Sequence, residues 1–347
     1  MNWNPITLRQ LKRFRSIRRG YYSLWIFGIM MFLAFSAEMW VNSRALMVYY
    51  SGQWYFPTYG DMIPGTVFGL DYSYETNYRE LQKKFEKEKA GNWVLLPIAP
   101  YNAFETDLDA THFPPHPPSL EARHYLGTDS IGRDLLARLV YGFRVCILFS
   151  LMLLVINFSI GITVGCLMGY WGGAFDLIFQ RVIEIWSSIP FLYVIMIISS
   201  MVVPNLTMLV LISVFFGWMG LTWYMRTLTY KEKARTYVLA AKALGAGNTR
   251  IILKHILPNS LSLIITFVPF SVAGGISSLT ALDYLGFGLP APTPSWGELL
   301  QQGTNNLHAP WIISSTVIAL VVVLVTITFI GEAVREAFDP KMHTIFE

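Results

Sequence analysis

Few side chains in this sequence have the types and spacing that chemistry requires. His112 and His116 are four residues apart, as in a helical metal pair, but the prolines between them exclude a helix. The chain has no Gly-x-x-x-x-Gly-Lys-Ser/Thr phosphate loop, no His-Glu-x-x-His and no Gly-x-Ser-x-Gly. We therefore expect a protein that is not an enzyme, holds no metal and binds no cofactor of its own.

Two further candidates are explained by packing. Cys146 and Cys166 fall in one apolar segment, where twenty residues of helix would separate them by about 30 Å, so they cannot form a disulfide. Arg181 and Glu184 are one helical turn apart near the end of another apolar segment. Charged side chains inside membrane segments usually indicate a functional site. These two lie near the edge of the membrane, where a structural ion pair is favoured.

The most distinctive segment is short and basic, and covers residues 237–259. Ala240, Ala241 and Leu244 give a first short helix a small apolar face. Gly245 and Gly247 let the backbone leave helical angles at little cost. The pattern predicts two short helices around a glycine turn.

The second helix of this segment has its own start and stop signals. Asn248 is a good N-cap, and Pro258 removes a backbone donor and restricts the residue before it. We expect a helix that begins at Asn248 and ends before Pro258.

The composition is that of a membrane protein. The 347 residues are 54% hydrophobic and 14% charged, against about 25% charged in soluble domains. Six apolar segments are long enough to span a bilayer: 21–41, 144–169, 178–203, 206–225, 261–282 and 311–331. Pro190 should kink the third of them. The lipid bilayer is therefore one expected partner, and nothing suggests nucleic acid.

Charge predicts which side of the membrane each loop faces. Residues 1–20 carry six basic side chains and no acid, and residues 226–260 carry seven against Glu232. By the positive-inside rule both segments are cytoplasmic, as is the tail 336–347. A cleaved signal peptide ending near 34–36 is the competing interpretation of the first span, and it leaves segment 226–260 on the same side.

Residues 42–142 form an expected extracytoplasmic insert between the first two spans. They hold nine basic and twelve acidic side chains and no span-length apolar run. Residues 79–89 read as a solvated helix with Glu80 and Lys84 at i, i+4 spacing. The insert's aromatic side chains could bind a partner or form a small core: Trp54, Tyr55, Phe56, Tyr72 and Tyr74.

The end of the insert reads as an amphipathic helix that starts at Ile131 and leads into the second span. Asp129 with Arg133, and Asp134 with Arg138, have the spacing of i, i+4 ion pairs. Residues 284–297 are rich in glycine and proline, which predicts an irregular loop on the outer side.

Several of these segments resemble one family. Segment 237–259 resembles the EAA loop of the membrane subunits of ABC importers, with Leu239 in place of the glutamate and His255 in place of an isoleucine. Residues 127–134 (Gly-Thr-Asp-x-x-Gly-Arg-Asp), residues 284–297 and residues 331–340 resemble the peptide and nickel branch. The positions that match the EAA spacing are Ala240, Ala241, Gly245, Leu257 and Pro258.

The N-terminal part narrows the resemblance. Residues 14–20, 54–57 and 113–119 are similar to the Yej-type permeases of oligopeptide and microcin C importers. The resemblance implies the type I importer fold, with a transmembrane domain at 143–335 and a coupling loop at 226–260. It also implies a bacterial inner-membrane location with both termini cytoplasmic.

The resemblance also implies partners and a mechanism. These are a second, homologous permease, cytoplasmic ATPase subunits that bind the ATP, and a periplasmic substrate-binding protein. With Leu239 in place of glutamate, we expect the loop to engage the ATPase by shape and through Lys242 or Arg250. No residue can be assigned to substrate contact from the sequence.

Two other function classes remain open at this point. An ion-driven secondary transporter would need acids inside its spans, and these are almost absent here. A membrane-anchored adaptor or sensor would need no transport path. Transport by a purified complex would separate the three classes.

Overall fold

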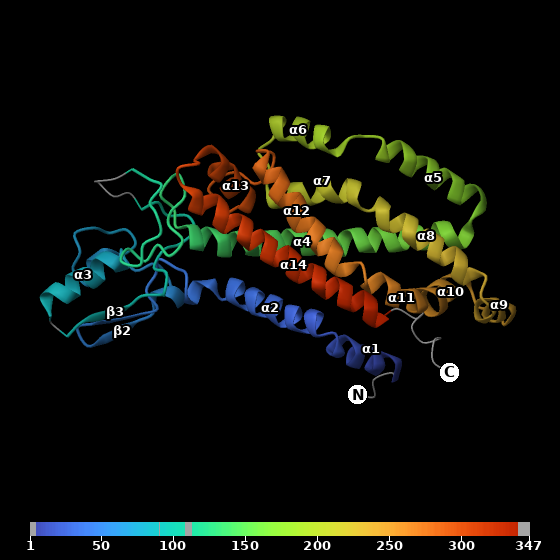
Figure 1. Ribbon diagram of the computed structural model, residues 1–347, viewed down its shortest axis with the longest axis horizontal. Coiled ribbons are helices and arrows are strands. Elements are labelled where there is room, and N and C mark those ends of the chain that lie inside the picture. Colours follow the sequence, from blue (N-terminus) through green and yellow to red (C-terminus); the bar gives the residue numbers. More distant parts are fainter. Residues whose placement is uncertain (1–4, 90, 108–112, 339–347) are drawn as a thin grey trace.

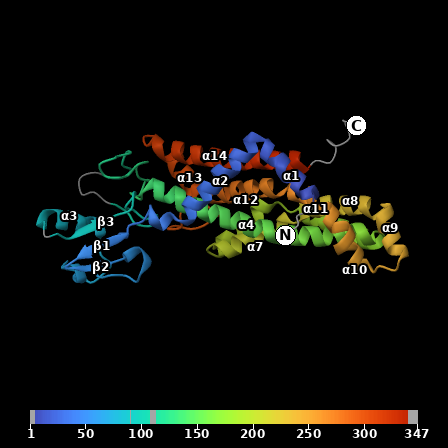
Figure 2. The ribbon, with the colours of Figure 1, turned by 90° about the horizontal axis from the view of Figure 1, so that it is seen from below.

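The computed structural model describes residues 5–89, 91–107 and 113–338 as a long helical bundle with a small mixed α/β unit at one end (Figure 1). His112 and the tail beyond 338 lie outside the described residues. In both ribbon views, α4 (Leu135–Trp171) and α12 (Val268–Tyr284) lie between α7 (Leu206–Gly217) and α14 (Pro310–Phe338) (Figures 1 and 2). We call the end with the α/β unit the insert end, and the end with α9 (Thr236–Ala243) and α10 (Asn248–Ile251) the loop end.

Among the described residues, four helical segments are long and apolar enough to cross a membrane. They are α4 (Leu135–Trp171), α7 with α8 (Leu206–Lys233), Leu263–Tyr284, which includes α12 (Val268–Tyr284), and α14 (Pro310–Phe338). The pair α5 (Gly173–Ser187) and α6 (Phe191–Met201) makes a fifth if its 63° bend lies within one span. Pro190 stands at this bend, as the N-cap of α6, which confirms the predicted kink.

The helix at the predicted first span, 21–41, begins and ends earlier than expected. After α1 (Pro5–Ser16), helix α2 covers Arg18–Phe35 and is followed by a single 3-10 turn, Ala37–Met39. Two side chains end α2 by taking its last carbonyls: Ser36 Oγ donates to Phe32 O at 2.7 Å, and Trp40 Nε1 donates to Leu33 O at 2.9 Å. Since α2 falls outside the candidate spans found among the described residues, the expected total of six is not confirmed.

Helix α4 begins later than expected, at Leu135 instead of Ile131. Gly132 has a φ of +89°, which breaks the helical path, and Asp134 caps the helix by accepting from Ala137 N at 2.8 Å. The predicted Asp129–Arg133 pair forms at 2.7 Å. The predicted Asp134–Arg138 pair does not form, because Asp134 is used by the cap and by a histidine described below.

The segment between α2 and α4 folds around a small sheet, so the expectation of an all-α protein holds only for the bundle. Strand β1 (Met47–Tyr50) pairs antiparallel with β2 (Gln53–Tyr55) and with β3 (Trp93–Leu95). Helix α3 (Tyr78–Glu88) covers the sheet and confirms the predicted helix. Their shared core consists of Ala45, Val48, Phe68, Tyr78, Leu81, Phe85 and Val94.

A side chain of α3 has other partners than expected, and the aromatic side chains of the insert divide between core and surface. Lys84 pairs with Glu88 at 3.9 Å and donates to Gly69 O at 2.6 Å, so the expected Glu80–Lys84 pair is wrong. Tyr55 packs against the core, whereas Trp54 is 54% exposed.

The glycine- and proline-rich loop after α12 is irregular as predicted, but only to residue 295, since Trp296 begins α13 (Trp296–Asn305). The Asp283 carboxylate accepts from Leu289 N at 2.7 Å and from Ser295 Oγ at 2.5 Å. This one side chain therefore holds the loop back against the end of α12.

Candidate functional site

The loop end is one continuous run of short helices. It consists of α8 (Met219–Lys233), α9 (Thr236–Ala243), α10 (Asn248–Ile251), a π-helical turn (Ile252–Ile256) and α11 (Leu257–Ile265). Gly245 has a φ of +82° between α9 and α10, where a residue with a side chain would be strained. The structure thus confirms two short helices around a glycine turn.

The residues predicted for this segment lie mostly on its surface. Leu244 is 88% exposed and Leu239 is 53% exposed. Both values are high for large apolar side chains, and they leave α9 available to another protein. Ala240, Lys242, Gly245, Arg250 and Pro258 are also exposed, while Ala241 and Leu257 are half-buried.

The opposite side of the same segment is fixed to the bundle. Val238, Ile251 and Ile256 are buried together with Tyr170, at the end of α4. The Tyr170 hydroxyl donates to Asn248 Oδ1 at 2.9 Å. Asn248 is therefore not the N-cap we expected: Gly247 occupies that position, and the Asn248 side chain ties the segment to α4.

The second helix also does not stop before Pro258, since helical structure continues to Ile265. The wider π turn at Ile252–Ile256 precedes the proline and accommodates its missing donor. Asn259 Nδ2 donates to His255 O at 2.8 Å and Ser260 Oγ donates to Ile256 O at 2.9 Å. These side chains provide hydrogen-bond donors for carbonyls near the proline. The expectation that a helix stops before a proline does not take such donors into account.

A long-range ion pair joins α5 to α8 beside the loop end. Asp176 accepts from Arg226 Nε at 2.5 Å and from Arg226 Nη2 at 2.6 Å, and the Tyr230 hydroxyl donates to Asp176 at 3.1 Å. The sequence gives no local signal for this pair, because its members are fifty residues apart. The predicted Arg181–Glu184 pair forms at 2.6 Å and is exposed.

Helices α4 and α8 approach closely through three glycines. An added Cβ at Gly165 would lie 2.6 Å from Thr222 O, and one at Gly169 would lie 2.6 Å from Arg226 O. Gly161 extends the stripe toward the middle of α4. The spacing Gly-x-x-x-Gly-x-x-x-Gly was a readable signal for this contact. Cys166 is buried beside the stripe and Cys146 is buried farther along α4, as predicted for packing residues.

At the insert end, a buried charge network joins α13 to the start of α4. Glu298 accepts from Arg133 Nη2 at 2.6 Å and also pairs with Arg138. Arg138, whose side chain is 0% exposed, has Asp129 Oδ2 at 3.6 Å. Trp296 Nε1 donates to Leu139 O at 2.8 Å. Two segments that resemble family motifs are thus bound to each other.

A second ionic cluster holds the last part of the insert in place. His124 Nδ1 lies 2.8 Å from Asp134 Oδ2, and His124 Nε2 lies 3.2 Å from Asp107 Oδ2. The imidazole stacks on Tyr101 with ring centroids 3.9 Å apart. Burial disfavours the charged imidazole, but the hydrogen bonds and charges of Asp107 and Asp134 outweigh it and raise the pKa of His124 to about 9.

This pKa predicts how the stability of the insert depends on pH. Because the folded pKa, about 9, lies above the reference value of 6.5, the stabilisation is complete below about pH 6.5 and is lost as pH rises through 9. We expect the advantage of the wild type over His124→Gln, on the order of 1–3 kcal/mol, to shrink between these limits. Thermal unfolding of both proteins in detergent at several pH values measures it. A difference that does not vary with pH would contradict the assignment.

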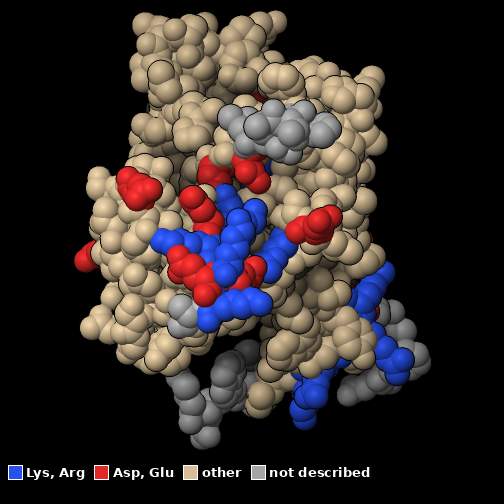
Figure 3. Space-filling view, turned by 90° about the vertical axis from the view of Figure 1, so that its left-hand side faces the viewer, with Lys and Arg blue, Asp and Glu red and all other residues tan. Residues whose placement is uncertain are grey.

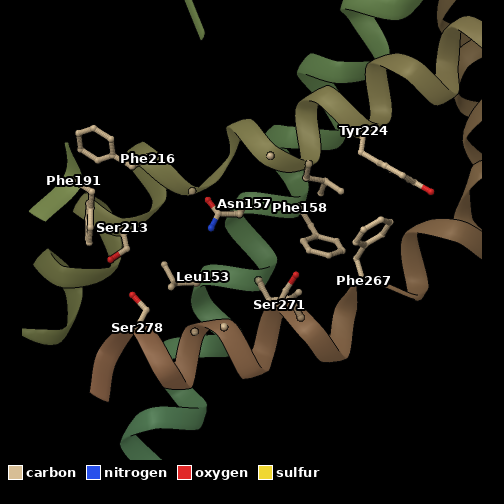
Figure 4. Close-up of a pocket in the computed structure, with 16 residues that line it drawn as sticks. Leu153, Asn157, Phe158, Phe191, Ser213, Phe216, Tyr224, Phe267, Ser271 and Ser278 are labelled. Atoms are coloured by element: carbon tan, nitrogen blue, oxygen red, sulfur yellow. The ribbon is translucent and has the colours of Figure 1, made fainter. Parts of the chain in front are cut away.

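A pocket of about 490 Å³ lies in the middle of the bundle, between α4, α6, α7, α8 and α12. Figure 4 shows the side chains of Asn157, Ser213 and Ser278 pointing into the space between α4, α7 and α12. Leu153, Phe158, Phe191, Phe216 and Phe267 supply apolar walls. No sequence motif indicates a role for any of these residues.

The outer face of the insert end carries a cluster of charged side chains (Figure 3). Figure 3 shows Lys and Arg side chains gathered at the centre of this face with Asp and Glu around them. Helix α3 supplies four basic and three acidic side chains to the insert. A cleft of about 900 Å³ lies beside it, lined in part by Arg79, Lys83, Arg123 and His124. This is a polar surface suited to a protein partner.

Comparisons with known proteins find transport permeases that are similar to this chain over most of its length. The family model described as "binding-protein-dependent transport system inner membrane component" matches residues 161–344. Over 97% of this chain and 98% of the relative, the sequence is 43% identical to the inner membrane ABC transporter permease protein YejE of Escherichia coli.

Two other relatives give the same picture. The peptidoglycan transport system permease protein YejE of Agrobacterium fabrum is 36% identical over 98% of this chain and 94% of its own. The oligopeptide transport system permease protein OppC of Haemophilus influenzae is 35% identical over 65% of this chain and 72% of its own. The first two matches include the insert as well as the bundle.

Proposed function

The chain belongs to the family of binding-protein-dependent inner-membrane transport components, as a permease of the ABC peptide importers, and from this premise we propose how it works. We infer that it forms half of a path for oligopeptides or peptide-like compounds such as microcin C. Its loop end, centred on α9 and α10, receives the motion of the ATPase subunits, which bind the ATP. The observation that carries this inference is the exposed helix–glycine–helix surface at the loop end.

The arrangement of charge supports the orientation in the membrane. The basic helix α1, the end of α14 and the loop end lie together, opposite the insert (Figure 1). By the positive-inside rule this end faces the cytoplasm, so both termini are cytoplasmic and the insert is periplasmic. An ATPase could then reach α9, and a binding protein could reach the insert.

The surface of α9 supports contact by shape more than by charge. Leu239 projects where the family motif has a glutamate, and Leu244 is the most exposed large side chain of the segment. The small side chains Ala240 and Ala241 let a partner approach the helix backbone. Lys242 and Arg250, both exposed, supply the remaining polar contacts in this proposal.

The remaining partners follow from the family and from the surfaces left open. A second, homologous permease would complete the path, because the pocket-bearing bundle is open on the α5–α6 side, where Leu177, Ile185 and Ile197 are each about three-fifths exposed. The charged face of the insert would dock the substrate-binding protein or the sister subunit.

Reconstituted transport tests the proposed function. The complete complex in proteoliposomes should take up an oligopeptide when ATP is supplied on the side of the membrane that the ATPase subunits face. Vanadate should stop this uptake. Uptake driven by a proton gradient alone would contradict the proposal. Competition by a microcin C-like peptide nucleotide and by a peptidoglycan-derived peptide would rank the substrate classes that the relatives' names suggest.

The glycine turn gives a direct test of coupling. Gly245→Pro forces φ to about −65° where the structure has +82°, so α9 and α10 must change their relative orientation. We expect peptide-stimulated ATP hydrolysis by the complex to fall about tenfold, equivalent to about 1.4 kcal/mol of lost coupling.

Gly247→Ala is the matched control, because Gly247 has a φ of −69° and an added Cβ meets nothing within 4 Å. The control should keep wild-type coupling. Unchanged stimulation in Gly245→Pro would remove the loop from the coupling mechanism.

A further inference from the structure

The central pocket holds polar atoms that the protein leaves without partners. Among the described residues, Ser213 Oγ and Asn157 Oδ1 are buried and have no hydrogen-bond partner, and Ser213 is only 8% exposed. Both side chains line the pocket and point into it (Figure 4). Unpaired polar groups at membrane depth are costly, so they are retained where a function uses them.

The glycines around the pocket keep it open. An added Cβ at Gly217 would lie 2.6 Å from Asn157 Nδ2, so glycine leaves room for the Asn157 side chain. At Gly220 of α8 and Gly274 of α12, an added Cβ would meet nothing within 4 Å. Both line the pocket and present bare backbone to it.

One helical segment bends sharply beside this pocket, and two others have a local irregularity there. The bend between α5 and α6 comes just before Phe191, the break between α7 and α8 follows Gly217, and the break between α11 and α12 includes Phe267. All three of these residues line the pocket. The α5–α6 bend of 63° is the sharp one, and non-helical backbone at membrane depth is tolerated where it is buried in protein or lines a cavity.

Two tryptophans fix two of these segments to each other. Trp186 Nε1 from α5 and Trp218 Nε1 from the α7–α8 break donate to the same carbonyl, Phe215 O, at 3.0 and 3.1 Å. These two hydrogen bonds therefore hold α5 against α7 on one side of the pocket, despite the bend between α5 and α6.

The chemistry of the lining identifies a ligand class. None of the described residues that line the pocket carries a charge, so nothing there neutralises a peptide terminus or a charged side chain. An amide oxygen and a hydroxyl without partners match the N–H and C=O of a peptide bond. The phenylalanine and leucine walls match an apolar side chain, and the volume of about 490 Å³ falls within the roughly 300–1,000 Å³ of small-ligand pockets.

We propose that this pocket binds the uncharged part of a transported peptide, one peptide bond with an adjoining apolar side chain, through Asn157 and Ser213. The proposal rests on the proposed transport function and adds a specificity site within this one subunit. The charged ends of the peptide remain outside the pocket, which lets peptides of different length use the same site.

Photolabelling of the complete complex tests the site. The probe is the tripeptide alanyl-benzoylphenylalanyl-alanine, added to proteoliposomes and irradiated, with the labelled positions found by mass spectrometry. We expect the label within 153–158, 213–224 or 267–278. The double variant Asn157→Leu with Ser213→Ala should reduce labelling and raise the half-saturating peptide concentration by about tenfold, as expected for two lost hydrogen bonds.

Two variants separate this role from a structural one. Ser159→Ala, on the exposed side of α4, removes a hydroxyl that donates only to Val155 O and should label and transport as the wild type does. Ser213→Ala alone should reduce labelling, whereas Ser213→Thr keeps the hydroxyl and should retain most of it.

The outcomes are distinguishable from failure of the transport function itself. If the wild-type complex shows no ATP-driven peptide uptake, the proposed function fails. If uptake is ATP-driven but the label lies only outside the three ranges or on the second permease, this inference is overturned. Labelling unchanged in the double variant also overturns it, since the polar atoms then serve only ordered water.

Discussion

Glu298→Gln should destabilise the protein by about 3 kcal/mol, because it leaves a buried charge network unbalanced. In the wild type, Glu298 and Asp129 neutralise Arg133 and Arg138, and the Arg138 side chain is 0% exposed. Glutamine keeps the shape but removes one negative charge, so a buried guanidinium loses its partner. Thermal unfolding of the purified chain in detergent measures the loss.

A surface ion pair in the same chain provides the control for Glu298→Gln. Glu184→Gln breaks the pair with Arg181, whose side chains are 48% and 76% exposed, and should change stability by less than about 1 kcal/mol. Adding Arg133→Gln to Glu298→Gln restores charge balance, so the double variant should lose less than the sum of the two single changes. Equal, small effects of Glu298→Gln and Glu184→Gln would show that the network is not a stabilising unit.

Gly165→Leu should have the other large effect, because it separates the two most closely packed helices of the bundle. An added Cβ alone would lie 2.6 Å from Met225 Cβ and from Thr222 O, and the latter is backbone that cannot rotate away. Overpacking costs about 1–3 kcal/mol where side chains can adjust, and the cost here should exceed that range. We expect a lower unfolding temperature and a lower yield of assembled complex.

Gly28→Leu controls for adding a large side chain to an apolar helix. At Gly28 of α2, an added Cβ meets nothing within 4 Å, so leucine fits without displacing a neighbour. It should assemble and unfold as the wild type does. If Gly165→Leu behaved like Gly28→Leu, the close approach of α4 and α8 would not be needed for stability.

The local features of the chain were readable from sequence. Apolar length and period indicated the helices of the bundle, Pro190 placed the bend between α5 and α6, and Gly245 placed the turn between α9 and α10. The pairs Asp129–Arg133 and Arg181–Glu184 form as predicted, whereas Asp134 and Lys84, at the same spacing from their expected partners, are used by other groups. Ordered motifs also led to the permease family, which the comparisons confirm.

The errors share one physical cause, which is competition from side chains that local rules do not consider. Trp40 and Ser36 end α2 early, the π turn with Asn259 carries the helix past Pro258, and Tyr170 takes the Asn248 side chain away from a cap. In each case a side chain forms a hydrogen bond that the expectation from neighbouring residues did not include.

The sequence by itself determined the membrane class, most helices, the glycine turn and the family. Only the tertiary structure decided which distant side chains meet: Arg138 with Glu298, Arg226 with Asp176, and Asn157 with Ser213 around one pocket. Hydrophobic length and turn chemistry act over a few residues and leave a trace in the sequence. Contacts between helices depend instead on how closely those helices approach and on which faces they turn to each other, and that is settled only when the bundle packs.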